Sequence, residues 1–266
     1  MKFKVKRRKQ DTIKLFELDY SQVELRVAAD LSDDPVMMDC FLTRKDIHSL
    51  TASRVLGVPA DEITKKQRQS AKPINFGTIF DMSAKGLQES AEKEYGIILS
   101  DVEAAMWRAG FFRLYRGFRN WMIRETMLAT KRGCSYVLWD GEPYATRWLP
   151  DLGSSNGRKQ GHAKRQALNT PIQGGASLYT LKALIALYRL WYAGKLPGVV
   201  SIMHTIHDSI ILAIYESFAQ DVLQRAGRVM VSFPTVRVPL EVEGKMGDTL
   251  GDMVEIGTVN SMDLVI

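Results

Sequence analysis

The sequence predicts an α+β fold in which a small antiparallel sheet domain holds a helical insert. Strand-like segments occur near the start of the chain, at 12–18, and again in its last third, at 199–215. A mostly helical stretch separates them. The chain has 266 residues, of which 45% are apolar and 25% charged, and this composition is that of a globular protein with a substantial core.

The first elements follow from short-range patterns. Residues 12–18 are rich in apolar and β-forming residues and predict a strand, with Asp19 at its end. In the next stretch, 21–31, apolar residues recur every four positions, which predicts a helix.

The middle of the chain carries helix start and stop signals. Thr64 is a candidate N-cap, Ser100 with Glu103 forms a capping-box pattern, and Gly57 is a candidate C-terminal stop. Helices are therefore expected over 46–57, 64–80 and 100–130, the last as one or two helices.

Turn residues change the pattern after the helical region. Residues 133–149 predict a hairpin, and 151–161 predict a flexible loop. Residues 162–193 predict a helical stretch, with a kink or a break at Pro171 because proline removes a helix hydrogen bond.

The last third predicts strands around one further helix. Residues 199–215 form two β-rich arms around His207 and Asp208. A helix is expected over 217–232, and an edge strand over 235–243.

Charge and cysteine usage narrow the class of protein. The net charge of +6 and a pI of about 9.2 suggest a polyanionic partner such as nucleic acid. The basic residues within 2–9 are either a solvated terminus or a strip that contacts phosphates. Cys40 and Cys134 are far apart and indicate reduced thiols in an intracellular, cytoplasmic protein. No signal peptide and no membrane span are expected.

Two aspartates are candidate metal ligands. Asp19 and Asp208 both lie beside predicted strands, where a sheet can hold two carboxylates together. Paired carboxylates suit Mg²⁺, and two such ions can clamp the attacking and leaving oxygens of a phosphoryl displacement. The alternative interpretation is a pair of unrelated turn or surface residues.

A second candidate set lies on the helix over 64–80. Arg68, Lys72, Phe76 and Phe80 are spaced by four and share one helix face. Two cations beside two rings suit a triphosphate next to a stacked base. The alternative is an ordinary amphipathic helix, which the spacing alone favours.

Three motifs resemble those of family A (DNA polymerase I-like) DNA polymerases. DYSQVELR resembles motif A, RQSAKPINFG resembles motif B, and the HD of TIHDSI resembles motif C. The stretches DIHSLTASRVLGVP and ALNTPIQG are also similar to that family. The resemblance covers about 13–250. It implies a polymerase palm at 1–30 and 131–266 and an inserted fingers subdomain at 31–130.

The resemblance also implies an activity and residue roles. The activity is template-directed DNA synthesis, by transfer from a dNTP to a primer 3′-hydroxyl on primer–template DNA, with two Mg²⁺ ions, or Mn²⁺, as cofactors. Asp19, Asp208 and the Tyr20 carbonyl would hold the metals, and Lys72 would act in catalysis. The implied nucleotide-binding residues are Gln22, Glu24, His48, Arg68, Lys72, Phe76 and Phe80, and the implied DNA-binding residues are Arg165, Asn169, Gln173 and His207.

Four positions depart from the family pattern. Ser209 replaces the usual motif C glutamate and cannot supply its charge. Phe80 stands in place of tyrosine and Asp81 in place of glycine. Pro73 lies inside the predicted fingers helix and predicts a local distortion beside Lys72.

Only 18 residues precede Asp19, so we expect this chain to lack the thumb and exonuclease domains of the family. We therefore expect a second polypeptide to supply the thumb and perhaps the exonuclease, as in a split phage polymerase. One alternative is a catalytically weakened, polymerase-like DNA-binding subunit, which Ser209 favours. A related single-chain RNA polymerase is a third reading, against which Glu24 weighs as a gate that excludes the ribose 2′-hydroxyl.

Overall fold

The computed structural model describes residues 11–233 and 237–264 and confirms the α+β fold class. The basic strip within 2–9 lies outside the described residues. The chain divides into two compact units. The sheet unit comprises Met1–Val23 and Ala176–Ile266, and the helical unit comprises Glu24–Gly175. These bounds differ from the predicted 1–30, 31–130 and 131–266, so the ranges of palm and fingers remain a prediction.

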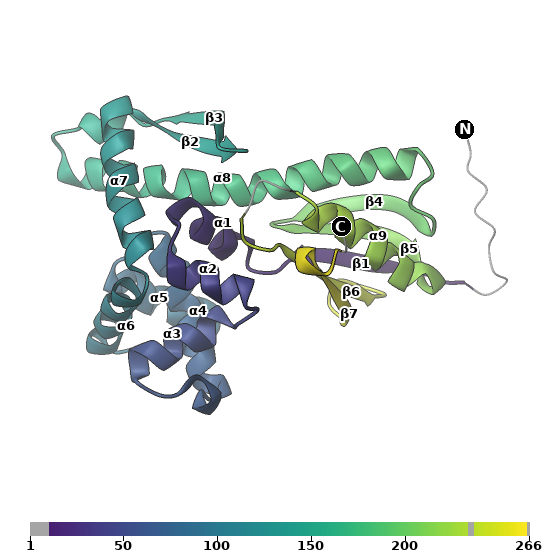
Figure 1. Ribbon diagram of the computed structural model, residues 1–266, viewed down its shortest axis with the longest axis horizontal. Coiled ribbons are helices and arrows are strands. Elements are labelled where there is room, and N and C mark those ends of the chain that lie inside the picture. The colour runs from purple at the N-terminus through teal and green to yellow at the C-terminus, as the bar shows by residue number, and fades with distance from the viewer. Residues whose placement is uncertain (1–10, 234–236, 265–266) are drawn as a thin grey trace. The chain divides into compact units, whose positions relative to one another are not determined.

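The sheet unit contains five antiparallel strands in the order β4-β5-β1-β6-β7 (Figure 1). The central strand β1 covers 13–18 of the predicted segment 12–18, and the hairpin around His207 and Asp208 is present as β4 and β5. The bounds are β1 Ile13–Tyr20, β4 Val199–Ile206, β5 Ser209–Tyr215, β6 Glu241–Gly247 and β7 Val254–Asn260.

The two faces of β1 differ in character because side chains alternate along a strand. Phe16, Leu18 and Tyr20 are buried, whereas Glu17 and Asp19 on the other face are half-buried. The helix α9 (Ala219–Val231) packs on the sheet, and the Tyr20 hydroxyl donates to the Met230 carbonyl at 2.6 Å. This packing fixes the direction in which Asp19 points relative to the core.

The predicted edge strand at 235–243 is wrong in position and in kind. The strand β6 begins at Glu241 and pairs with β1 on one side and β7 on the other, so it is an inner strand. Residues 234–236 lie outside the described residues. The β-forming residues of 235–243 predicted a strand there, but Pro239 and Leu240 precede the strand, which begins at Glu241.

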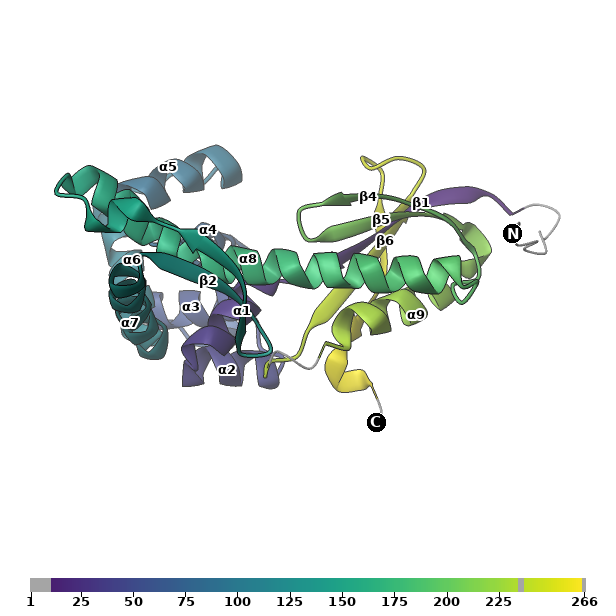
Figure 2. The same ribbon diagram turned by 90° about the horizontal axis from the view of Figure 1, so that it is seen from above.

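The helical unit is built mainly from the region predicted to be helical (Figure 2). The capping boxes Thr64–Gln67 and Ser100–Glu103 are both formed, and Gly57 ends its helix at φ 70°. The helices are α1 Val23–Ser32, α2 Pro35–Leu42, α3 Ile47–Leu56, α4 Lys65–Ile79, α5 Ala84–Tyr95, α6 Asp101–Leu114 and α7 Arg116–Arg132.

The predicted hairpin is present as β2 (Cys134–Trp139) and β3 (Glu142–Trp148), followed by the long helix α8 (Gly157–Tyr192). The helix α8 contributes to both units, whose boundary falls after Gly175.

The helix α8 runs through Pro171 as one helix, so of the predicted kink or break the break does not occur. Proline has no N–H to donate to the Ala167 carbonyl. That carbonyl instead accepts a hydrogen bond of 2.8 Å from the hydroxyl of Ser135, which is fully buried. The helix α4 likewise continues through Pro73.

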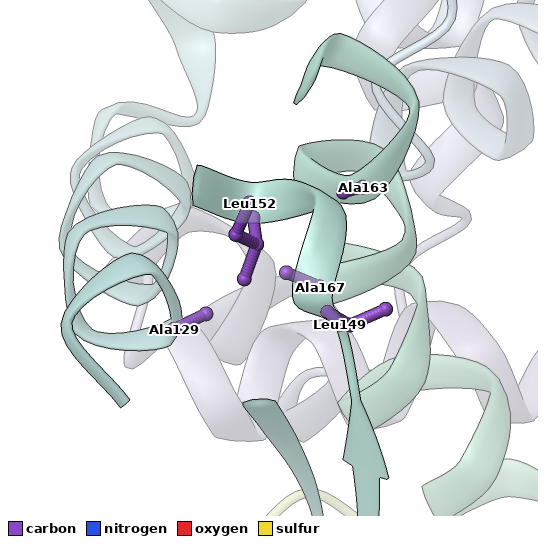
Figure 3. Packing of buried hydrophobic residues seen from close by; sticks show 5 residues of the cluster. All are labelled: Ala129, Leu149, Leu152, Ala163 and Ala167. Carbon is purple, nitrogen blue, oxygen red and sulfur yellow. The ribbon is translucent and has the colours of Figure 1, made fainter. Parts of the chain in front are cut away.

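The predicted flexible loop at 151–161 is also wrong. A short 3-10 helix spans Pro150–Gly153, and α8 already begins at Gly157. Leu149 and Leu152 are buried in a small apolar cluster that ties this segment down (Figure 3). The other members of the cluster are Ala129 of α7 and Ala163 and Ala167 of α8.

Among the described residues, no helix combines the length and the apolar character that crossing a membrane requires.

Candidate active site

The carboxylates of motifs A and C are brought together by strand pairing within the sheet unit. Asp19 pairs with Ser209 across β1 and β5, and Asp208 is the residue directly before Ser209. The two aspartates are 189 positions apart in the sequence, and the pairing of β1 with β5 brings them close together.

Burial and neighbouring carboxylates raise the cost of ionising both aspartates. Burial, and next the charge of Asp208, raise the pKa of Asp19 from 3.8 to about 7. Burial is also the main cause that raises the pKa of Asp208, while His207 and Lys245 act in the opposite sense. A carboxylate pair of this kind gains stability when a cation neutralises it.

Further charged side chains share this face of the sheet. Glu243 lies opposite Asp19 on β6, and Lys245 lies opposite Glu17. The Lys245 Nζ atom is 3.8 Å from Asp19 Oδ2 and 3.6 Å from Glu17 Oε2. The sequence analysis did not predict Glu17, Glu243 or Lys245 as part of this site. Glu17 could have been predicted, because residues two apart on a strand, such as Glu17 and Asp19, point to the same face.

The donors available to a metal ion are all oxygen atoms, which suits Mg²⁺ or Mn²⁺. Among residues 11–233 and 237–264, no three His, Cys, Asp or Glu side chains converge as a metal cluster. The side chain of Tyr20 is buried in the core and its hydroxyl is bonded to Met230. The role predicted for Tyr20 as a metal ligand therefore involves its backbone carbonyl alone.

The motif C turn has an unusual backbone. His207 is exposed and has a φ of 53°, a left-handed conformation that is uncommon for residues other than glycine. Ser209 is 2% exposed, and its hydroxyl donates to the Ile206 carbonyl at 2.9 Å, across the same turn. The position where the family pattern has glutamate therefore carries a neutral, internally bonded side chain.

Gln22 also has a left-handed backbone, with a φ of 55°, directly before α1 begins at Val23. It lies in the sheet unit, three residues after Asp19, and is half-buried.

Four of the predicted site residues line one cavity of about 380 Å³ in the helical unit. Glu24 comes from α1, Phe76 from α4, Phe80 caps the C-terminus of α4, and Gln173 comes from α8. A carboxylate, two rings and an amide around one cavity provide both stacking and hydrogen-bonding surface.

The same cavity has lining residues that the sequence reasoning did not name. Met82, Ser90, Glu94 and Tyr95 belong to α5 or to the turn before it. Burial, and next the charges of Glu94 and Glu24, raise the pKa of Tyr95. Gly96 could have predicted that a helix ends at Tyr95, because glycine often follows the last residue of a helix.

The cationic end of α4 is already partly engaged. Arg68 contacts Asp46 with Nη2–Oδ2 and Nε–Oδ2 distances of 2.5 and 3.1 Å, while Asp46 also caps α3 through the Ser49 N–H. Burial opposes the ionisation of Asp46, but the contacts with Arg68 and Ser49 outweigh it and lower its pKa. Lys72 lies one turn further along α4 and is half-buried.

His48 is placed in the interior rather than on the surface. It is 1% exposed, its Nδ1 atom lies 2.9 Å from Asn75 Nδ2, and its ring centroid is 5.7 Å from that of Phe76. Burial lowers its pKa to about 4, so the imidazole is neutral near pH 7. His48 supports the Phe76 segment, and its direct contact with a nucleotide remains a prediction.

Arg165, Asn169 and Gln173 are spaced by four on α8, within the helical unit. Arg165 and Gln173 are exposed, and Asn169 is half-buried. The Asn169 Oδ1 atom is buried and accepts no hydrogen bond from the described part of the chain. An orphan acceptor of this kind is costly unless a ligand or water satisfies it.

Arg165 also borders a second cavity, of about 710 Å³, together with Asp81 and Arg108. Asp81 has a φ of 55° and forms an ion pair of 2.8 Å with Arg108, whose Nε donates to the Met82 carbonyl. The departure from glycine at Asp81 is thus matched by a specific partner on α6.

Comparisons with known proteins match most of the chain to one family. The family model described as DNA polymerase family A matches residues 3–252. DNA polymerase I of Pseudomonas aeruginosa is 34% identical over 234 residues, which are 88% of this chain and 24% of that protein. The DNA polymerase of Bacillus phage SP01 is 32% identical over 249 residues, 91% of this chain and 26% of that protein.

A solved structure shows the same fold. The POL domain of Pol1 from M. smegmatis, in complex with DNA primer-template and dNTP, superposes with a TM-score of 0.74 at 32% identity. The match covers 89% of this chain and 40% of that domain's chain. This chain therefore spans less than half the length of the relatives that it matches. Since the family model covers nearly all of its residues, the chain belongs to DNA polymerase family A.

Proposed function

We propose that this chain is the core of a DNA-directed DNA polymerase, which transfers a nucleotide from a dNTP to a primer 3′-hydroxyl. The observation that carries the proposal is the register that sets Asp19 opposite Ser209 and hence beside Asp208. Family membership and the solved relative with DNA primer-template and dNTP support it.

In this proposal Asp19, Asp208 and the Tyr20 carbonyl hold two divalent ions, Mg²⁺ or Mn²⁺. Bound there, such ions would neutralise charge that develops on the phosphate oxygens during an in-line displacement. The protein's own contribution is to hold two carboxylates together in a partly buried setting that disfavours their ionisation without a cation.

The helical unit would bind the nucleotide. Phe76 offers a face for stacking, and Glu24 restricts the space beside the sugar in the cavity that both line. Phe80 lines the same cavity and would lie near the template base. Arg68 and Lys72 would neutralise the triphosphate, aided by Gln22 and His48, and Lys72 would assist the reaction. Because Arg68 already contacts Asp46, binding phosphate would require it to leave or share that partner.

Primer–template DNA would contact the exposed row on α8 and the motif C turn. Arg165, Gln173 and His207 are exposed polar side chains, and Asn169 offers an unsatisfied acceptor. Arginine contributes through phosphate charge, and amides through hydrogen bonds to bases or sugars.

A second polypeptide carrying a thumb, and perhaps an exonuclease, completes the proposal. This chain matches 40% of the solved polymerase-domain chain, and the proposed partner would supply surfaces that the remaining part carries there. We place palm at 1–30 and 131–266, fingers at 31–130, and the activity in the cytoplasm, of a host cell if the chain is phage-encoded.

One observation favours a second candidate, a catalytically weakened DNA-binding subunit. Ser209 is buried and bonded within its own turn, so it offers no charge to a metal ion.

Primer extension separates the two candidates. The protein, alone and with a candidate thumb partner, is given primer–template DNA, Mg²⁺ and dNTPs. Extension that disappears in Asp19→Asn and Asp208→Asn supports the polymerase. DNA binding that survives both substitutions, with no extension by the unaltered chain under either condition, supports the binding subunit.

A further inference from the structure

Lys245 places a positive charge among the carboxylates of the sheet unit. It projects from β6 opposite Glu17, and its Nζ atom lies 3.6 Å from Glu17 Oε2 and 3.8 Å from Asp19 Oδ2. The side chains of Lys245, Glu17 and Asp19 are 30%, 20% and 31% exposed, so the group is only partly solvated. Water and salt therefore screen it less than they screen a surface ion pair.

The rest of this face is acidic. Glu243 lies opposite Asp19 on β6, and the charges of Asp208, Glu17 and Glu243 all disfavour ionisation of Asp19, whereas Lys245 favours it. Glu17, Asp19 and Glu243 on this sheet face and Asp208 in the adjoining turn repel one another, and one ammonium group offsets part of that repulsion.

We infer that Lys245 is a positioning residue for the metal site, an internal cation that holds the Asp19 side chain in place and that weakens the binding of divalent ions there. The inference rests on the proposed metal-binding role of Asp19 and Asp208. It differs from a purely structural cross-strand pair because it predicts an effect on metal affinity.

The sign follows from Coulomb's law. A fixed positive charge near a divalent cation repels it, and removing that charge tightens binding. At separations of about 6 Å, even in a water-like dielectric, this amounts to roughly a threefold to tenfold change in affinity. Lys245→Met removes the charge and keeps the aliphatic stem, and Lys245→Arg keeps the charge.

The test measures Mn²⁺ binding to the full chain by titration calorimetry and by electron paramagnetic resonance, at pH 8.5, without nucleotide or DNA. The control is Lys14→Met, which removes another ion pair of β1, the 2.7 Å contact with Asp248, further along the strand from Asp19. Lys245→Met is expected to bind Mn²⁺ roughly threefold to tenfold more tightly. Lys245→Arg and Lys14→Met are expected to bind it as the unaltered chain does.

Equal Mn²⁺ affinity in Lys245→Met and Lys14→Met would overturn the inference, as would tighter binding in Lys245→Arg. If Lys245→Met fails to fold, Lys245→Gln serves for the same comparison. Asp19→Asn distinguishes a failure of the proposed metal site from a failure of the role of Lys245. Mn²⁺ binding that survives Asp19→Asn contradicts the proposed metal site itself, whereas binding that is lost there but unaffected at Lys245 contradicts only the role of Lys245.

Discussion

Asp19 makes the stability of the chain depend on pH. Its pKa is raised from 3.8 to about 7, so between these values the folded protein keeps a proton that the unfolded chain has lost. The free energy of unfolding should therefore fall as the pH rises from about 4 to about 7, and stay low above that. In Asp19→Asn this fall should be smaller, and each 1 kcal/mol recovered at pH 8 raises Tm by about 2–4 °C. Thermal denaturation between pH 4 and 8 measures both; identical pH profiles would contradict the shifted pKa.

Ser209→Glu tests how an added negative charge opposite Asp19 affects stability. Ser209 is buried and lies opposite Asp19, so a glutamate there adds a carboxylate to an already crowded, partly desolvated group. We expect the free energy of unfolding to drop by about 1–3 kcal/mol without metal. Added Mg²⁺ should recover more stability in this variant than in the unaltered chain, because a cation relieves the repulsion. Chemical denaturation with and without Mg²⁺ gives the comparison. Ser209→Gln, of similar size and no charge, should lose stability without recovery by Mg²⁺.

At the scale of elements, the contact between α4 and α5 depends on Gly77. A Cβ atom added there would lie 2.3 Å from Leu87 Cδ2, and Leu87 is fully buried. Gly77→Ala should lower the free energy of unfolding by about 1–3 kcal/mol, and should weaken nucleotide binding because Gly77 also lines the 380 Å³ cavity. Gly86→Ala in α5 is the matched control, since its added Cβ would come no closer than 3.5 Å to a neighbour. Equal stability of the two variants in chemical denaturation would refute the packing argument.

The continuity of α8 through Pro171 depends on Ser135. Removing its hydroxyl in Ser135→Ala leaves the buried Ala167 carbonyl without its 2.8 Å donor, which should cost about 1–3 kcal/mol. Pro171→Ala restores a backbone N–H to the same carbonyl. The double variant should therefore lose less than Ser135→Ala alone, and a double-mutant cycle by chemical denaturation measures this coupling. Additive losses would show that the two residues do not share the carbonyl.

At the scale of the whole molecule, the surplus of positive charge should govern DNA affinity. The chain carries a net charge of +6, and phosphate contacts make binding depend steeply on salt. Removing one phosphate contact in Arg165→Ala should reduce the slope of log K against log salt by about 1. Fluorescence anisotropy with primer–template DNA at several salt concentrations measures the slope. Arg225→Ala, on α9 of the sheet unit and paired there with Asp221, should leave the slope unchanged.

The sequence alone predicted the parts of this protein that local rules govern. Capping residues set the ends of α3, α4 and α6, because Thr64, Ser100 and Gly57 act within one helix turn of themselves. The motifs around Asp19, Lys72 and Asp208 predicted the family, because chance agreement at such specific short motifs is very unlikely. These signals lie in short stretches and need no knowledge of distant contacts.

Only the tertiary structure decided the features that depend on partners remote in sequence. Pro171 stays helical because Ser135 of β2 satisfies a carbonyl, and 150–157 is ordered because Leu149 and Leu152 find an apolar cluster. The inner position of β6 and the meeting of Lys245 with Asp19 follow from strand register. Register is set by which faces a sheet can bury, and that choice is made by the assembled core rather than by any one segment.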